Sequence, residues 1–283
     1  MYPEQFEYHR PSSVSEAVNL LSENPDAKIL AGGHSLLPAM KLRLAAPSAL
    51  VDIGRIDSLK GITVNGGATI GAGVTYREII DSAELATAFP LMVEATKIVG
   101  DPAVRSRGTL GGSLAHVDPA ADLTAVVLAL NASVTVEGSG GQREIAVDEL
   151  FAGLLTTTMT ADEIITSISL PQEFSQAKCA YEKHAHPASG YAVVGVAVAL
   201  LMDGDTCQTA RIAVTGAPEY AMRATAAEAE LQGKSVNTET IAAAAAKAND
   251  GLGELNGDVY ASAEYRAHLV KVLTRRALEK ASS

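Results

Sequence analysis

Two short segments, each with a pair of adjacent glycines and nearby hydroxyl side chains, are the strongest candidates for ligand binding. The first is Ala31-Gly32-Gly33-His34-Ser35 and the second is Thr109-Leu110-Gly111-Gly112-Ser113. Glycine lets the backbone approach a ligand closely and adopt positive φ. Consecutive N–H groups in such a segment can converge on an anion such as a pyrophosphate. One glycine pair is equally compatible with a tight turn, but two pairs with hydroxyl donors favour a phosphate cradle.

Other reactive residues do not form a complete catalytic or metal-binding set. His34 lies inside the first glycine segment, where a histidine more often forms hydrogen bonds or packs than acts as a base. His184 and His186 share one face of a strand but lack a third ligand nearby in the sequence. Cys179 and Cys207 cannot supply four thiolates to an iron–sulfur cluster, although a disulfide between them stays open. We therefore expect no metal site and no catalytic residue of this chain's own.

The elements that would position the first glycine segment are readable from local signals. Residues 28–31 form an apolar run that predicts a strand leading into Gly32, and residues 50–53 predict a second strand. Ser13 and Glu16 form a capping box that predicts the start of a helix. Residues 61–73 alternate around Asn65-Gly66-Gly67, which predicts a hairpin.

The second glycine segment lies among predicted helices. Thr75 and Glu78 form another capping box, whose helix extends to Leu85, and Pro90 begins a helix that reaches Ile98. A helix is predicted over residues 119–130 after the glycines. Strands follow at residues 134–136, 143–147 and 164–170.

A polar stretch at residues 172–176 predicts a domain boundary. Beyond it, residues 178–184, 191–202 and 209–215 predict three strands, and the pattern from residue 224 onward is helical. The sequence thus divides into residues 1–173, with subdomains of about 1–56 and 57–173, and residues 174–283.

Composition and charge narrow the class of protein. The 283-residue chain is 47% hydrophobic and 19% charged, which is enough apolar material for two cored domains. Its formal net charge of -11 disfavours binding to nucleic acid. Residues 1–5 lack the features of a signal peptide, and the longest apolar run, 191–202, is shorter than a membrane span. We therefore expect a cytoplasmic protein that is not integral to a membrane.

The chain resembles the FAD-binding medium subunits of molybdenum hydroxylases, the carbon monoxide dehydrogenase and xanthine dehydrogenase family. The similarity extends over nearly the whole chain, and its motifs occur in the family's order, which makes the combination highly specific. The matching segments are residues 6–11, 30–38, 105–116, 118–122, 181–183, 191–192 and 263–266.

This resemblance implies an α+β fold. A two-subdomain FAD-binding domain of the vanillyl-alcohol oxidase (PCMH) type is followed by a smaller domain with an antiparallel three-stranded sheet and a helical bundle. It implies non-covalent FAD, with the pyrophosphate held by residues 31–35 and 109–113, Asp122 on a cofactor hydroxyl, and Lys183 and Tyr191 beside the isoalloxazine. The residues implied to contact FAD are Lys28, Ile29, Leu30, Ala31, Gly32, Gly33, His34, Ser35, Leu36, Val99, Thr109, Gly111, Gly112, Ser113, Asp122, Ile165, Lys183 and Tyr191.

The resemblance also implies partners that carry the other cofactors. A large subunit would hold the molybdenum cofactor, and a small subunit with 2Fe-2S clusters would relay electrons to the medium subunit's FAD. An external acceptor (a quinone, a cytochrome or NAD) would receive them, and the complex would be a dimer of heterotrimers. The substrate, whether carbon monoxide, a purine, an N-heterocycle or an aldehyde, is selected in another chain.

Two positions depart from the family pattern. Ser113 replaces an asparagine found in many relatives, and both side chains donate hydrogen bonds. Residues 184–190 replace a more basic sequence, which puts direct use of NAD in doubt. Two alternatives stay open: a stand-alone flavin-dependent reductase or oxidase of the same fold, and an assembly subunit that has lost its flavin.

Overall fold

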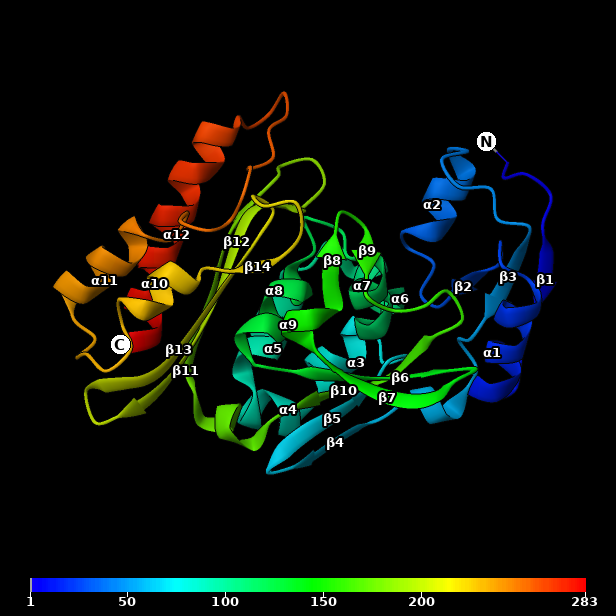
Figure 1. Ribbon diagram of the computed structural model, residues 1–283, viewed down its shortest axis with the longest axis horizontal. Coiled ribbons are helices and arrows are strands. Elements are labelled where there is room, and N and C mark those ends of the chain that lie inside the picture. Colours follow the sequence, from blue (N-terminus) through cyan, green and yellow to red (C-terminus); the bar gives the residue numbers. More distant parts are fainter. Residues whose placement is uncertain (1) are drawn as a thin grey trace.

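The computed structural model describes residues 2–283 and places three bodies in a row (Figure 1). A small parallel sheet in the order β1-β3-β2 lies at one end, a five-stranded antiparallel sheet with helices lies in the middle, and a four-stranded sheet covered by helices lies at the other end. Within the described residues, no helix combines the length and apolar character needed to cross a bilayer.

The N-terminal body is built around the strand that leads into the first glycine segment. The helix α1 begins after Ser13, whose side chain accepts from the Glu16 amide, so the predicted start is confirmed. Its buried face packs with the parallel sheet in one apolar cluster. The elements are β1 (Glu7–His9), α1 (Val14–Glu23), β2 (Lys28–Leu30), α2 (Leu36–Lys41) and β3 (Ala49–Asp52).

The middle body confirms the predicted hairpin and strands and corrects two helices. A single helix from Thr75 through Leu85 is wrong: Ser82 ends α3, and its side chain accepts from the Leu85 amide to begin α4. The helix expected from Pro119 begins only at Asp122. The elements are a 3₁₀ turn (Asp57–Leu59), β4 (Ile62–Asn65), β5 (Gly67–Gly71), α3 (Tyr76–Asp81), α4 (Ala83–Ala88), α5 (Pro90–Lys97), α6 (Pro102–Arg107), α7 (Leu110–His116), α8 (Asp122–Ala129), β6 (Ser133–Gly138), β7 (Gly141–Ala146), α9 (Val147–Leu150), β8 (Phe151–Gly153), β9 (Thr156–Thr157) and β10 (Ile164–Leu170).

The C-terminal body has its helices α10–α12 on one face of the sheet, while α5 and α8 of the middle body pack on the other face (Figure 1). The sheet has a fourth strand, β14, which is too short to show a periodic pattern in the sequence. The elements are a 3₁₀ turn (Gln172–Gln176), β11 (Lys178–Ala185), β12 (Ala192–Asp203), β13 (Thr206–Thr215), β14 (Met222–Arg223), α10 (Thr225–Ala229), α11 (Thr238–Ala246) and α12 (Ala263–Ser282).

Strand β12 shows why this sheet is covered on both faces. Ala197 and Ala199 belong to the apolar cluster of the middle body, whereas Val196 and Val198 belong to the cluster under the C-terminal helices. Small side chains thus face α8 and larger ones face α10–α12. The predicted boundary at residues 172–176 therefore separates two segments of chain that share a continuous apolar core.

The amides of β12 are expected to exchange with solvent slowly, because the strand is central in its sheet and both faces are buried. Protection should exceed that of the edge strand β7, whose residues are mostly exposed, by about 100-fold or more. Hydrogen exchange followed by mass spectrometry measures both strands in one experiment. Rapid exchange along the whole of residues 192–201 would contradict this placement.

Candidate functional site

The first glycine segment is the turn between β2 and α2. Gly33 has φ +75°, a left-handed conformation that favours glycine. Among residues 2–283, no acceptor is found for the backbone N–H groups of Gly33, His34 and Ser35. His34 is exposed, and its Nδ1 lies 3.2 Å from the Gly32 carbonyl. Three consecutive donors at this turn therefore stay available to a ligand.

The second glycine segment is the beginning of helix α7 and differs in one respect from the predicted loop. Thr109 caps the helix by accepting from the Gly112 amide. The amides of Leu110 and Gly111 donate to Val74 and Ala72 at 3.1 and 2.9 Å, and the Ser113 amide donates to Thr109. The expectation of free converging amides is therefore wrong for this segment, because the neighbouring chain already uses them. The Thr109 hydroxyl caps the helix and is buried, and Ser113 lies one residue beyond the glycine pair.

The fold brings the two glycine segments into direct contact. A Cβ on Gly32 would lie 2.1 Å from the Arg107 carbonyl oxygen and 3.0 Å from the Gly108 Cα. A Cβ on Gly112 would lie 3.9 Å from the Ala31 Cβ, on the side that faces the first segment. Glycine at position 32 is thus required for the close approach of the two bodies, which brings the two glycine segments side by side.

Tyr76 connects the second segment to a polar cluster deeper in the protein. Its ring packs so closely on Gly108 that a Cβ there would lie 2.7 Å from Cε2. Burial raises the pKa of Tyr76 to about 12, while its hydrogen bond with Ser113 acts in the opposite direction. The negative charges of Asp122, Tyr191 and Asp118 also raise this pKa.

The polar cluster joins Asp122 to Tyr181 and Lys183. Lys183 Nζ lies 2.9 Å from Asp122 Oδ2, and the Tyr181 hydroxyl donates to Asp122 Oδ1 at 2.6 Å. The side chains of Lys183 and Asp122 are only 3% and 4% exposed. Burial raises the pKa of the Asp122 carboxyl above its usual value, and the Lys183 charge opposes that shift.

A loop of the middle body and a loop of the C-terminal body close over this cluster. Lys183 Nζ donates to the Ile98 carbonyl at 3.3 Å, and a Cβ on Gly190 would lie 3.6 Å from the Gly100 Cα. Tyr191 follows directly and is 46% exposed. Burial, and then the charges of Asp118 and Asp122, raise the pKa of Tyr191. Tyr191 therefore presents a half-exposed ring above buried charges.

Most of the predicted residues fall into two connected groups. Residues 31–35 and 109–113 form one group, and Asp122, Lys183 and Tyr191 form the other. Val99 packs against the main core, next to Ile98, whose carbonyl accepts from Lys183. Ile165 lies in the main core on β10 and is 5% exposed, Lys28 is exposed on an edge strand, and Leu36 begins α2. Ile29 and Leu30 complete the strand β2 as half-buried residues.

Sequence reasoning missed several residues of this site, and two of them carried a signal. Tyr181 is two residues before Lys183 on a predicted strand, so both side chains had to share one face. Gly195 interrupts an otherwise bulky apolar strand, which is typical of a close approach by another group. Tyr76 lies between Thr75 and Glu78 of a capping box, and nothing in that pattern indicates a role in the site.

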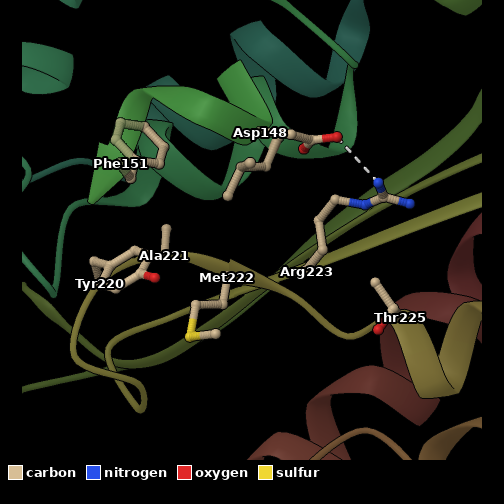
Figure 2. A pocket seen from close by; sticks show the side chains of 8 residues that line it. Asp148, Phe151, Tyr220, Ala221, Met222, Arg223 and Thr225 are labelled. Carbon is tan, nitrogen blue, oxygen red and sulfur yellow. Dashed lines mark hydrogen bonds and ion pairs between the residues drawn. The ribbon is translucent and has the colours of Figure 1, made fainter. Parts of the chain in front are cut away.

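A separate pocket lies between the middle and C-terminal bodies (Figure 2). Its volume is about 260 Å³, and its lining shares no residue with the predicted site. Asp148 receives Arg211 Nη2 at 2.7 Å and Arg223 Nη1 at 3.1 Å, and the second of these pairs is seen in Figure 2. These ion pairs join the two bodies. The pocket therefore lies at the interface between them and is not part of the glycine site.

Comparison with known proteins places the chain in a family. A family model described as the FAD binding domain in molybdopterin dehydrogenase matches residues 4–173, and the CO dehydrogenase flavoprotein C-terminal domain matches residues 179–281. The carbon monoxide dehydrogenase medium chain of Hydrogenophaga pseudoflava is 39% identical over 99% of this chain and 98% of its own length. The nicotine 6-hydroxylase medium subunit of Paenarthrobacter nicotinovorans is 38% identical over 98% and 97%.

The solved structures agree with the sequence comparison. Carbon monoxide dehydrogenase from Hydrogenophaga pseudoflava, in a form that lacks the Mo-pyranopterin moiety, superposes with a TM-score of 0.96 at 41% identity, covering 99% of this chain and 98% of that one. Quinoline 2-oxidoreductase from Pseudomonas putida 86 gives a TM-score of 0.92 at 34% identity over 100% and 98%. The chain belongs to the family of FAD-binding medium subunits of molybdenum hydroxylases of the carbon monoxide dehydrogenase and xanthine dehydrogenase type.

Proposed function

We propose that this chain holds FAD non-covalently between its two glycine segments and transfers electrons within a cytoplasmic molybdenum hydroxylase. It receives them from a small iron–sulfur subunit and passes them to an external acceptor. The observation that carries this proposal is the contact between the glycine segments, with three unpaired backbone donors on one side and hydroxyl groups on the other. When bound, FAD supplies the redox chemistry, and the chain supplies binding and orientation.

The residues present fit a flavin dinucleotide. The N–H groups of Gly33, His34 and Ser35 suit a pyrophosphate, because charged acceptors form strong hydrogen bonds with backbone amides. Across the contact lie two further hydroxyls, that of Thr109, which accepts from the Gly112 amide, and that of Ser113, which is hydrogen-bonded with Tyr76. At the other end, Tyr191 offers a half-exposed ring against which a flat aromatic group can lie.

Lys183 is the residue that we assign to the flavin ring, although its charge is already paired. An ammonium has three N–H donors, and in the structure they face the Ile98 carbonyl and Asp122, both of whose carboxylate oxygens lie 2.9 Å from Nζ. Because Asp122 Oδ1 also accepts from Tyr181, one of these N–H groups can turn to an acceptor on the isoalloxazine. A cation held there would favour negative charge on the ring. Asp122 is then a group that orients Lys183, in addition to the hydroxyl-binding role that the family resemblance implies.

The relatives support a complex in which another chain selects the substrate. Their names refer to carbon monoxide, nicotine, glyceraldehyde and caffeine, although these subunits share 32–39% identity with this chain over nearly its full length. We therefore propose a large molybdenum subunit and a small iron–sulfur subunit as partners, assembled as a dimer of heterotrimers. Identifying the co-purifying large subunit would give the substrate.

Titration of the flavin-free chain with FAD and with FMN tests the cofactor. FAD is expected to bind at least about 100-fold more tightly, because FMN lacks the pyrophosphate that three backbone donors and the hydroxyl groups would hold, each charge-assisted contact contributing about 1.5–3 kcal/mol. Quenching of flavin fluorescence measures both affinities. Equal affinities for FAD and FMN would show that the glycine segments do not bind a pyrophosphate.

A further inference from the structure

The side chains of Tyr181, Asp122 and Lys183 form a buried chain of hydrogen bonds. Tyr181 donates to Asp122 Oδ1 at 2.6 Å, and Lys183 donates to Oδ2 at 2.9 Å while its Nζ also lies 2.9 Å from Oδ1. Tyr181 is 5% exposed, and burial raises its pKa well above the usual value, so its hydroxyl keeps its proton and acts as a donor. Tyr181 and Lys183 therefore meet at the same oxygen, Oδ1, and Lys183 alone reaches Oδ2.

The C-terminal sheet is shaped to make this arrangement possible. Lys183, Gly195 and Thr215 form one row across three neighbouring strands. A Cβ on Gly195 would lie 2.2 Å from the Tyr181 hydroxyl and 3.0 Å from Cζ, so only glycine leaves room for the phenol to reach Asp122.

Thr215, the last residue of this row, also binds the segment that leads into Asp122. Thr215 Oγ1 lies 2.8 Å from the Pro119 carbonyl and 2.9 Å from the Ala121 carbonyl. The Gly216 amide donates to Pro119 at 2.7 Å. Asp122, the first residue of α8, is therefore fixed both at its backbone and at its side chain by residues of the other body.

We propose that Tyr181 is a positioning residue that acts through Asp122 to set the charge which Lys183 presents to the flavin. This inference rests on the proposed function, in which Lys183 donates one N–H to the ring. When a buried carboxylate loses one of its two donors, its negative charge is less well neutralised and interacts more strongly with the remaining donor. Here the remaining donor is the Lys183 ammonium. The ammonium then exerts a weaker field on the ring.

The test measures the reduction potential of the full-length chain loaded with FAD. Tyr181→Phe removes only the hydroxyl and is expected to weaken binding of reduced FAD relative to oxidised FAD by about tenfold, which lowers the two-electron potential by about 30 mV. Tyr265→Phe is the matched control, because Tyr265 is 43% exposed on α12, and it should leave the potential unchanged. Spectroscopic titration against a reference dye measures the potentials.

A double-mutant cycle distinguishes action through Asp122 from any direct effect of the phenol. In the Asp122→Asn background, Tyr181→Phe should shift the potential by less than a third of its effect in the unaltered chain. An equal shift in both backgrounds, or no shift in the unaltered chain, would overturn the proposal. Gly195→Ala provides a second route, since its Cβ would displace the Tyr181 hydroxyl and should lower the potential in the same direction.

Lys183→Met separates failure of this inference from failure of the proposed function. If Lys183→Met changes the potential and Tyr181→Phe does not, only the positioning role is overturned. If neither substitution changes it, the assignment of Lys183 to the flavin ring falls as well, and the positioning role falls with it. If the unaltered chain binds no FAD, the proposed function itself is wrong.

Discussion

Gly32→Ala is expected to weaken FAD binding by about 100-fold or more while the chain stays folded. The added Cβ would lie 2.1 Å from the Arg107 carbonyl oxygen and 2.8 Å from its carbon, and both are backbone atoms. The two glycine segments would have to separate by about 1 Å, and a displacement of that size at a positioned site typically costs about 100-fold. Flavin content after purification and the FAD dissociation constant measure the effect.

Gly140→Ala and Gly153→Ala are matched controls, because a Cβ at either position meets nothing within 4 Å and neither residue has positive φ. Both should bind FAD like the unaltered chain. Circular dichroism and thermal unfolding establish that Gly32→Ala folds. If that variant folds and retains FAD within about twofold of the controls, the contact between the glycine segments is not the pyrophosphate site, since a displaced site should cost far more.

Gly112→Val tests the same site from the other segment and should also lose FAD. Its Cβ would lie 2.7 Å from the Thr109 Oγ1 that caps α7 and 3.9 Å from the Ala31 Cβ of the first segment. Loss of the cap is expected to lower the free energy of unfolding by about 1 kcal/mol. The added side chain also fills the space between the two segments. A variant with lowered stability and normal flavin content would assign Gly112 to capping alone.

Features set by residues close in the sequence could be predicted. Ser13 with Glu16 and Thr75 with Glu78 begin helices because a side chain three residues away satisfies the free amides of a helix start. The break at Ser82 was missed, although Ser82 is itself a good N-cap residue, because an apolar pattern continues across it.

Features that depend on distant residues could not be predicted. The amides of the second glycine segment are used by Ala72 and Val74, whose positions are set by the hairpin that precedes α3. Likewise, the pairing of Asp122 with Lys183 joins residues 61 positions apart. No local pattern shows that two buried opposite charges will meet, and the family resemblance alone placed both residues near the cofactor. It did not indicate that they neutralise each other.

The largest expected difference in activity is between the isolated chain and the assembled complex. Loaded with FAD, the chain alone should not oxidise the substrate of the complex, and adding the large and small subunits should raise the rate at least about 100-fold. The chain has two cysteines, Cys179 on β11 and Cys207 on β13, whereas a 2Fe-2S cluster generally needs four ligands. In the proposed flavin site, the charged groups are paired with each other rather than arranged as a base and a nucleophile.

Reconstitution with purified subunits measures the oxidation rates of the isolated chain and of the complex, with an artificial dye and the physiological acceptor assayed in parallel. The Gly32→Ala chain is the informative control, because it should assemble with both partners yet lack FAD. Its complex should still reduce a dye that takes electrons from the partner subunits, but should not reduce an acceptor that depends on this chain. The Gly140→Ala chain should support both reactions. If the isolated FAD-loaded chain oxidises the substrate as fast as the complex does, the chain is a stand-alone oxidase and the electron-transfer role is wrong.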